Sequence, residues 1–365
     1  MSVFSQIEVM EHEQVIHCFD KSTGLKAIIA IHDTTLGPAL GGTRLLPYAS
    51  EEEALKDVLR LSRGMTYKAA CAGLHLGGGK AVIIADPANR TEAMFRAYGR
   101  FVESLAGRYI TAEDMNTNVT NMDHIRLETR HVAGISPSLG GSGDPSIMTA
   151  LGTFCGIQSA VKHRLGKHDL KGIKIAVQGV GAVGKHLCKY LYDSGAILFV
   201  QDINEKNLNY VKESFGATVV SEKELFALDV DVYSPCARGA TLNNTNIPQL
   251  KATVIAGCAN NQLEDEDVHS KMLKNLRICY APDYVINAGG VINVANELSG
   301  YNKQKVEQEV TNIAQTLDTI FQTADKENIT THASANKFAE NRINSVRNVK
   351  HLTIRDTSFF GSLKK

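Results

Sequence analysis

The chain has 365 residues, of which 43% are hydrophobic, 21% charged and 6% aromatic. At about 150 residues per domain, this length predicts two folded domains, each with its own core. The 39 basic residues balance the 39 acidic ones. Without a basic excess to attract polyanions, we expect neither nucleic acid nor a membrane surface as partner, and the apolar runs are too short to span a membrane.

The cysteine and histidine pattern bears on location and metal binding. Seven cysteines are scattered along the chain without a Cys-x-x-Cys pair. An odd, dispersed set of this kind predicts reduced thiols and a cytoplasmic protein rather than a disulfide framework. The 12 histidines form no i,i+4 pair, and we expect no metal site.

The first third of the chain predicts a mixed α/β unit. Strands are expected at 25–32, 81–85 and 109–111. Between the first two of these strands, Ser50-x-x-Glu53 is a capping box that predicts the start of a helix. The apolar face of that helix is expected to carry Ala54, Val58, Leu61 and Met65.

A segment rich in Gly, Ser and Pro follows this unit and predicts a domain boundary. Neither a helix nor a strand continues easily through such a composition. We interpret 1–134 as one domain, 135–145 as a hinge and 146–330 as a second domain. The alternative for 135–145 is an ordinary surface loop.

The second domain alternates short apolar runs with helical patterns. The helix after the first strand is expected to present Val183, Leu187 and Leu191 on one face, and Ser221-x-x-Glu224 is a second capping box. Alternation of this kind predicts a doubly wound parallel sheet. The expected strands are 173–178, 196–201, 217–220, 230–233, 253–256 and 277–280, followed by helices at 302–325 and 333–347.

The strongest motif is Gly179-x-Gly181-x-x-Gly184, which directly follows the strand 173–178 and opens a helix. In that context the first glycine makes the tight turn, and the second lets the backbone approach a pyrophosphate at the helix N-terminus. The third allows close packing of helix on strand. We therefore predict a dinucleotide site that includes Ala182 and Val183, with a plain glycine turn as the alternative.

Asp202 ends the next expected strand, 21 residues after Gly181. A carboxylate at this distance accepts hydrogen bonds from the ribose hydroxyls and repels a 2′-phosphate. No arginine follows it directly, and the nearest cation is Lys206. The pattern favours NAD over NADP, with Asp202 and the adjacent Ile203 as cofactor-binding residues.

Two lysines and one carboxylate are candidate catalytic residues. The run Gly77-Gly-Gly-Lys80 lacks the Ser or Thr of a P-loop, and its strand follows rather than precedes it. A lysine at the mouth of a buried strand can transfer protons. Lys68 lies three residues after Met65 on the apolar face of its helix, where it can pair with a substrate carboxylate or extend to solvent. Asp114 lies just past the expected strand 109–111. It is either a proton relay or an ordinary acidic residue of a loop.

Taken together, these motifs resemble the glutamate/leucine/phenylalanine/valine dehydrogenase family, and are most similar to its leucine dehydrogenases. The matching stretches are 26–44, 63–68, 77–80, 110–114, 177–181 and 281–294. The resemblance implies an α/β substrate and oligomerisation domain, a Rossmann domain for NAD, and a cleft between them. It also implies that 331–365 return to the first domain, and that the chain forms a homo-oligomer, either an octamer or a dimer.

The implied reaction is NAD-dependent, reversible oxidative deamination of an L-amino acid, leucine or another branched-chain one, to the 2-oxo acid and ammonia. By resemblance, Lys80 is the general base that activates water and Asp114 assists proton transfer. Lys68 binds the substrate carboxylate, helped by a turn at Gly41 and Gly42.

Further site residues follow from the same resemblance. An apolar side-chain pocket typical of a branched aliphatic substrate is expected from Leu40, Met65, Ala112, Val291 and Val294. Plain core packing is the alternative for these five residues. The nicotinamide end of the cofactor is expected to contact Thr149, Cys236, Ala237, Asn261 and Asn287.

Some positions depart from the leucine dehydrogenase pattern. Asn116 follows Asp114, Arg238 and Asn260 stand where apolar residues are usual, and Gly184 replaces an alanine. The asparagines also resemble the tryptophan-active branch. Phenylalanine or tryptophan as substrate therefore stays open, as does a catalytically silent NAD-binding module. A 2-hydroxy-acid dehydrogenase is less favoured, because no histidine has a comparable context.

Overall fold

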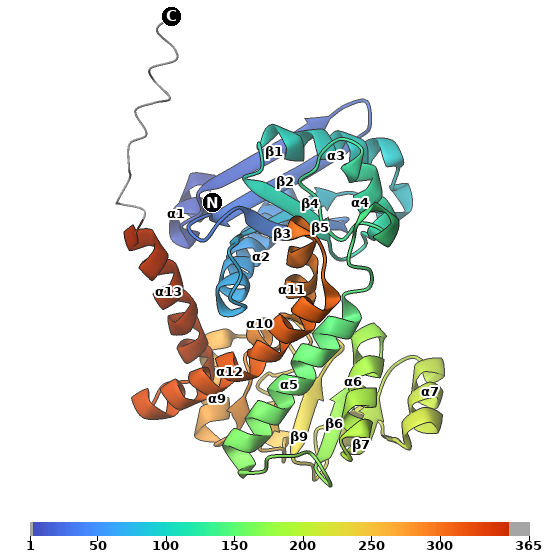
Figure 1. The fold of residues 1–365 in the computed structure, drawn as a ribbon, viewed down its shortest axis with the longest axis vertical. Coiled ribbons are helices and arrows are strands. Elements are labelled where there is room, and N and C mark those ends of the chain that lie inside the picture. The colour runs from blue at the N-terminus through green and yellow to red at the C-terminus, as the bar shows by residue number, and fades with distance from the viewer. Residues whose placement is uncertain (1–2, 350–365) are drawn as a thin grey trace, which may run out of the picture.

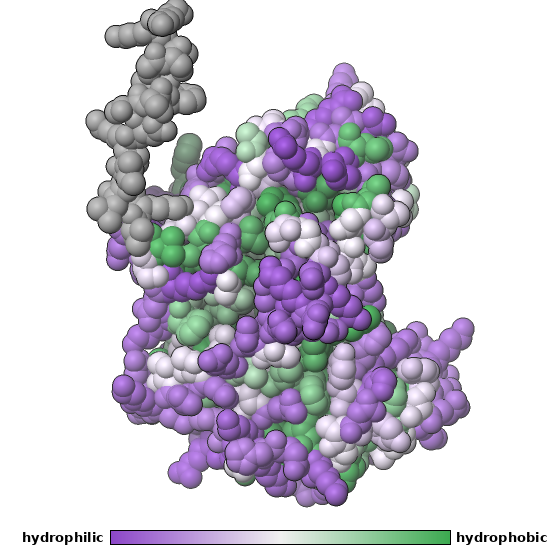
Figure 2. All heavy atoms as spheres, in the orientation of Figure 1, coloured by the Kyte–Doolittle hydropathy of each residue, from purple (hydrophilic) through white to green (hydrophobic). Residues whose placement is uncertain are grey.

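A computed structural model describes residues 3–349 of the chain. Two lobes lie one above the other, and helix α13 (Thr331–Val349) extends along one side from the lower lobe toward the upper one (Figure 1). An indentation separates them in the space-filling view (Figure 2). None of the helices within residues 3–349 combines the length and apolar character that a membrane crossing needs.

The first lobe is built on a five-stranded sheet in the order β1-β2-β4-β3-β5. β3 pairs in parallel with both β4 and β5, whereas β1 and β2 are antiparallel to their neighbours. The strands are β1 Gln14–Asp20, β2 Leu25–Asp33, β3 Ala39–Leu46, β4 Gly77–Ile84 and β5 Tyr109–Glu113. The helices are α1 Val3–Met10, α2 Glu51–Cys71, α3 Glu92–Ser104 and α4 Val119–Arg126.

Helix α2 begins where the capping box predicted. The Ser50 side chain accepts a hydrogen bond from the Glu53 amide at 3.1 Å. The Glu53 carboxylate accepts from the Ala49 amide instead of closing the box on Ser50. The second capping box, Ser221 with Glu224, forms with both of its hydrogen bonds.

The expected turn at Gly41 and Gly42 is wrong, because both residues lie inside β3. The expected strand at 81–85 with Lys80 at its mouth is also wrong in its bounds, since β4 already begins at Gly77 and Lys80 lies within it. Glycine has a low preference for β-strands. Here, however, the neighbouring backbones lie so close together that a side chain would not fit. A Cβ atom on Gly41 would lie 1.7 Å from the Gly79 carbonyl oxygen, and one on Gly78 would lie 2.1 Å from the Thr66 amide nitrogen of α2.

The second lobe contains the predicted doubly wound sheet, with all six strands parallel in the order β11-β10-β9-β6-β7-β8. The chain reverses its winding direction between β6 and β9, and such a switch point is where dinucleotides bind in this architecture. The strands are β6 Lys174–Gln178, β7 Ile197–Gln201, β8 Thr218–Val219, β9 Val232–Pro235, β10 Val254–Ile255 and β11 Cys279–Tyr280.

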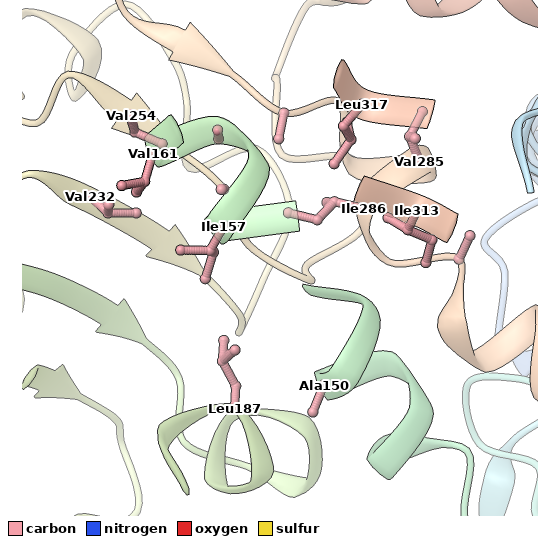
Figure 3. Close-up of a cluster of buried hydrophobic side chains, with 14 of the residues drawn as sticks. Ala150, Ile157, Val161, Leu187, Val232, Val254, Val285, Ile286, Ile313 and Leu317 are labelled. Atoms are coloured by element: carbon pink, nitrogen blue, oxygen red, sulfur yellow. The ribbon is translucent and has the colours of Figure 1, made fainter. Parts of the chain in front are cut away.

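Helix α5 lies at the centre of the second core. Its Ile157 and Val161 face Val232 and Val254 of the sheet, while Ile286, Ile313 and Leu317 pack from the other side (Figure 3). The helices of this lobe are α5 Ser146–Leu165, α6 Ala182–Asp193, α7 Glu205–Phe215, α8 Glu222–Leu225, α9 Glu266–Asn275, α10 Asp283–Ile286, α11 Gly289–Ala295 and α12 Lys303–Glu327. Short 3₁₀ turns lie at Pro87–Asn89, Pro137–Leu139, Ile247–Gln249 and Asn296–Ser299.

The last described helix, α13 (Thr331–Val349), joins the two lobes. Ala335, Ala339 and Ile343 pack into the core of the second lobe. The Arg342 guanidinium donates to three carbonyl oxygens, those of Ala69, Ala70 and Leu74, at 2.7–3.2 Å. Two of these carbonyls lie in the last turn of α2 and the third lies just after it, so Arg342 fastens α13 to the C-terminal end of α2. The return of 331–365 to the first domain stays a prediction, as do the boundaries at 134, 145 and 330, and 350–365 lie outside the described residues.

The glycine contacts lead to a stability prediction. Gly41→Ala should destabilise the protein by about 1–3 kcal/mol, because its methyl group would overlap the β4 backbone. Gly64→Ala is the matched control: this glycine lies in α2 with nothing within 4 Å of the new Cβ, so the change should be neutral or stabilise by about 0.5–1 kcal/mol. Urea denaturation at one fixed protein concentration measures both, and equal stability of the two variants would contradict the packing argument.

Candidate active site

Lys80, in the middle of β4, and Asp114, just after β5, form a largely buried ion pair. The Lys80 Nζ lies 2.9 Å from Oδ2 of Asp114, and the Arg44 Nε bonds the same oxygen at 3.0 Å. Arg44 extends this network to Asp57, whose Oδ2 also accepts from the Tyr48 hydroxyl. Burial alone would raise the pKa of Asp114, but Lys80 and Arg44 outweigh it and lower the pKa to about 2. Asp114 is therefore ionised across the physiological range.

Lys68 approaches the same region from α2. Its Nζ donates to Oδ1 of Asn260 at 3.3 Å, and that oxygen also accepts from Asn287 Nδ2 at 2.7 Å. Burial lowers the pKa of Lys68 to about 8, an effect that Asp283 and Asp114 oppose and Lys80 strengthens. The hydrogen-bond partner Asn260 is an uncharged amide, so the charge of Lys68 is available to a ligand.

A cavity of about 190 Å³ brings these groups together. Leu61 and Met65 of α2, expected on the apolar face of the helix, line it beside Lys68. Five basic side chains and three acidic ones face this space, which leaves a formal positive excess suited to an anionic ligand. The charged lining consists of Arg44, Arg60, Arg63, Lys68, Lys80, Asp114, Glu266 and Asp283.

Four of the five expected pocket residues meet between the lobes. Leu40 of β3 and Ala112 of β5 pack with Val291 and Val294 of α11, and we call this group the interlobe apolar cluster. Leu76, Ile110 and Ala133 complete it. Met65 lies apart from the cluster, in the cavity that contains Lys68.

The glycine-rich loop has the geometry that its motif predicts. Gly179 has φ +95°, a conformation that favours glycine, and a Cβ there would lie 2.7 Å from that of Ala237. Gly181 precedes α6 as its N-cap with open space around it. Because glycine supplies no capping side chain, the first-turn amides can bind a phosphate. A Cβ on Gly184 would lie 2.2 Å from the Gly179 carbonyl oxygen, which explains the third glycine.

Asp202 follows β7 and faces this loop. Its Oδ2 accepts from the Val180 amide at 2.7 Å, and its Oδ1 accepts from the Asn204 amide at 2.8 Å. The neighbouring Ile203 is 98% exposed. An isoleucine this exposed, beside the carboxylate that is predicted to bind the ribose, would offer an apolar surface to an adenine ring.

Of the residues expected near the nicotinamide, Cys236 and Ala237 directly follow β9 and lie beside the carboxyl end of β6. The Cys236 amide donates to the Gln178 carbonyl at 2.7 Å, which holds Ala237 against the glycine loop. Asn261 has φ +51°, and Thr149 lies against Gly290. The side-chain oxygen of Asn287 is buried without a hydrogen-bond partner among the described residues. A buried acceptor of this kind fits a donor on a bound ligand.

Sequence reasoning missed Arg44 and Asp283. Neither the composition nor the spacing of the residues around Arg44 marks it as a site residue. Its partner Asp114 lies 70 residues further on. Asp283 lines the cavity, and burial raises the pKa of this carboxyl. Only the folded chain brings these partners together, so no local signal could have identified them.

A dinucleotide-type glycine loop at a sheet switch point, in the same chain as a cavity lined by a lysine–carboxylate pair, is typical of a nicotinamide-dependent dehydrogenase. Residues 12–131 match the family model for the Glu/Leu/Phe/Val dehydrogenase dimerisation domain. Residues 140–205 and 197–351 match that for Glutamate/Leucine/Phenylalanine/Valine dehydrogenase. The chain belongs to this family of amino-acid dehydrogenases, so the predicted resemblance, fold class and enzyme class are confirmed.

Known relatives cover nearly the whole chain. A leucine dehydrogenase of Bacillus cereus is 53% identical over 357 residues, which are 98% of this chain and 97% of the relative. An L-tryptophan dehydrogenase of Nostoc punctiforme is 52% identical over 354 residues. The crystal structure of the Nostoc enzyme superposes with a TM-score of 0.85 over 95% of this chain and 100% of its own. A glutamate dehydrogenase of Peptoniphilus asaccharolyticus, 24% identical, shares the fold with a TM-score of 0.73.

The lowered pKa of Lys68 predicts how carboxylate binding depends on pH. Below about pH 8 the ammonium is charged, and above that pH its charge is lost. The inhibition constant of a non-reacting carboxylate such as 4-methylpentanoate should therefore rise above pH 8, approaching about tenfold per pH unit. In Lys68→Met the constant should be high and independent of pH. A flat profile in the unmodified protein would contradict the assignment of Lys68 to the carboxylate.

Proposed function

We propose that the protein catalyses reversible, NAD-dependent oxidative deamination of a branched-chain L-amino acid, leucine above all. One observation carries the proposal: the same two strand segments contribute to the cationic cavity at Lys68 and Lys80 and to the interlobe apolar cluster. On β3, Leu40 belongs to the cluster and Arg44 lines the cavity. Ala112 of β5 belongs to the cluster, and Asp114, just after β5, lines the cavity. An amino acid needs such a pair of neighbouring sites, one for its charged head and one for its side chain.

The head group is proposed to bind through charge and geometry. Lys68, protonated below about pH 8, pairs with the α-carboxylate. Its bond to Asn260 holds the ammonium in place at 3.3 Å. A fixed cation of this kind orients the α-carbon for reaction.

The proton transfers are assigned to Lys80 and Asp114. NAD, when bound, supplies the hydride acceptor. In the ion pair Lys80 carries a proton, which it first passes to Asp114, 2.9 Å away. The neutral Lys80 amine then takes a proton from the water that attacks the imine carbon, as the general base. Asp114 passes the proton it received to the departing amine, which leaves as ammonia, and returns to the ionised form that Lys80 and Arg44 favour.

The choice of NAD over NADP is proposed from Asp202. Its two oxygens are held by the Val180 and Asn204 amides, so the carboxylate has little freedom to move away. A 2′-phosphate would meet this negative charge at close range.

Two observations favour leucine over tryptophan as the substrate: the residues of the pocket and the contact made by Asn116. The interlobe apolar cluster contains small and medium aliphatic groups. Asn116, one of the residues that resembles the tryptophan-active branch, has φ +60° and donates to the Leu45 carbonyl at 3.0 Å. That contact holds the turn after β5 against β3, 71 residues away in the sequence, which gives Asn116 a structural role. Tryptophan remains the second candidate, because the Nostoc L-tryptophan dehydrogenase is 52% identical.

Self-association through the first lobe is part of the proposal. β1 is an edge strand of its sheet, and large apolar side chains are exposed beside it, with Phe4 82%, Val9 78% and Phe19 63% accessible. Edge strands with exposed apolar residues are typical of pairing surfaces. A second copy of this chain is the expected occupant, as a dimer or as part of an octamer.

The proposed reaction is tested by ammonium-dependent oxidation of NADH with three 2-oxo acids. We expect 4-methyl-2-oxopentanoate to exceed phenylpyruvate and indole-3-pyruvate in kcat/KM. Lys80→Ala should lower kcat by about 10²–10⁴, the usual contribution of a general base. A preference for indole-3-pyruvate would overturn the leucine assignment and keep the mechanism. Bound NADH without turnover of any oxo acid would favour a silent binding module.

Cofactor choice is tested by Asp202→Ser. Loss of the carboxylate should raise KM for NADH and lower that for NADPH, so that the ratio of the two kcat/KM values shifts toward NADPH by about 10–100-fold. Ile203→Ala is the matched control, because it weakens both cofactors alike by removing apolar contact to the adenine. Unchanged discrimination in Asp202→Ser would contradict the role given to this carboxylate.

A further inference from the structure

Two cysteines follow neighbouring strands at the carboxyl edge of the second sheet. Cys236 comes directly after β9, and Cys258 follows β10 by three residues. The two segments stay hydrogen-bonded past the strand ends: the Ala256 amide donates to the Tyr233 carbonyl at 3.1 Å and the Ala259 amide to the Pro235 carbonyl at 2.9 Å. Paired strands lie about 4.8 Å apart, which is within the Cα separation that a disulfide spans.

The close approach of these segments depends on Gly257. A Cβ at this position would lie 2.3 Å from the Pro235 carbonyl oxygen. The residue next to Cys258 is thus pressed against the residue next to Cys236. Both thiols are reduced, and Cys236 is the half-buried member of the pair while Cys258 is 9% exposed.

The environment makes Cys236 the more reactive thiol. A hydrogen bond from the Cys258 thiol lowers the pKa of Cys236 and raises that of Cys258. The Ser234 hydroxyl lies 3.4 Å from the Cys236 sulfur and adds to the effect. Burial instead raises the pKa of the other free cysteines, Cys18, Cys71, Cys155, Cys188 and Cys279. Thiolate character combined with partial exposure is what oxidation requires.

Both cysteines are connected to the dinucleotide site. The residue after Cys236 is Ala237, which packs against Gly179. The Cys258 carbonyl accepts from Asn287 Nδ2 at 3.1 Å. A change in the backbone at either cysteine would therefore move the glycine loop or the Asn287 amide.

We propose that Cys236 and Cys258 form a peroxide-sensitive dithiol that closes to a disulfide and weakens cofactor binding. The Cys236 thiolate attacks hydrogen peroxide, so that an S–O bond forms, the O–O bond breaks and hydroxide leaves. The Cys258 sulfur then attacks the resulting sulfenic acid: the S–S bond forms, and the hydroxyl leaves as water with the proton of Cys258. The net reaction consumes two thiols and one peroxide and yields one disulfide and two waters.

The proposal is tested on the full-length protein treated with hydrogen peroxide. Peptide mass spectrometry should find Cys236 linked to Cys258, and the Kd for NADH should rise about tenfold and return after treatment with dithiothreitol. The mass-spectrometric readout does not depend on which amino acid the enzyme uses. Its failure is thus distinguishable from failure of the proposed function.

Two variants and a control complete the test. Cys258→Ser and Cys258→Ala should bind NADH normally before oxidation and show no reversible loss of affinity after it. Cys18→Ser, a buried cysteine of the first lobe, should stay as sensitive as the unmodified protein. A disulfide from Cys236 to Cys188, or a reversible loss that persists in both Cys258 variants, would overturn the proposal.

Discussion

The contact that the site depends on is the close approach of three backbones, those of β3, β4 and α2. The Gly79 carbonyl occupies the space that a side chain at residue 41 would need, and the Thr66 amide does the same at residue 78. Because nothing larger than hydrogen separates these elements, Lys80 and Lys68 face one cavity of about 190 Å³ from a strand and a helix. The weak strand preference of glycine is offset by the parallel partners on both sides of β3.

Charge in this cavity is distributed so that the ammonium of Lys68 remains available to a ligand. Lys80 and Arg44 share Asp114, and Arg44 also bonds Asp57, so these four groups neutralise one another. Buried charges need such pairing to offset the loss of hydration. Lys68 has an amide partner, Asn260, in place of a carboxylate. The difference explains why burial lowers the pKa of Lys68 and why an incoming carboxylate would restore the missing partner.

The elements of the fold that the sequence predicts are those with a local residue pattern of their own. The six parallel strands alternate with helical segments, and Gly179, Gly181 and Gly184 follow a strand at the required spacing. The fold of the nucleotide-binding domain could therefore be predicted from the sequence. β3 was not predicted, because Gly41 and Gly42 interrupt its apolar pattern. Nor was α5, whose Gly152 and Gly156 pack against Ile313 and Ile286 with apolar groups on all sides and no amphipathic period. The pairing of Lys68 with Asn260 spans 192 residues, and local patterns contain no information on it.

The same pairing links the two halves of the proposed site. Asn260 accepts from Lys68 of the first lobe and from Asn287 of the second through one oxygen atom. An amide oxygen can accept both bonds only while the two donors stay within a narrow range of positions. Separation of the lobes would break the bond to Lys68 first, since Asn287 is also held by the Cys258 carbonyl. The proposed capture of substrate by Lys68 and the placement of the Asn287 amide therefore depend on one shared acceptor, the Asn260 amide oxygen.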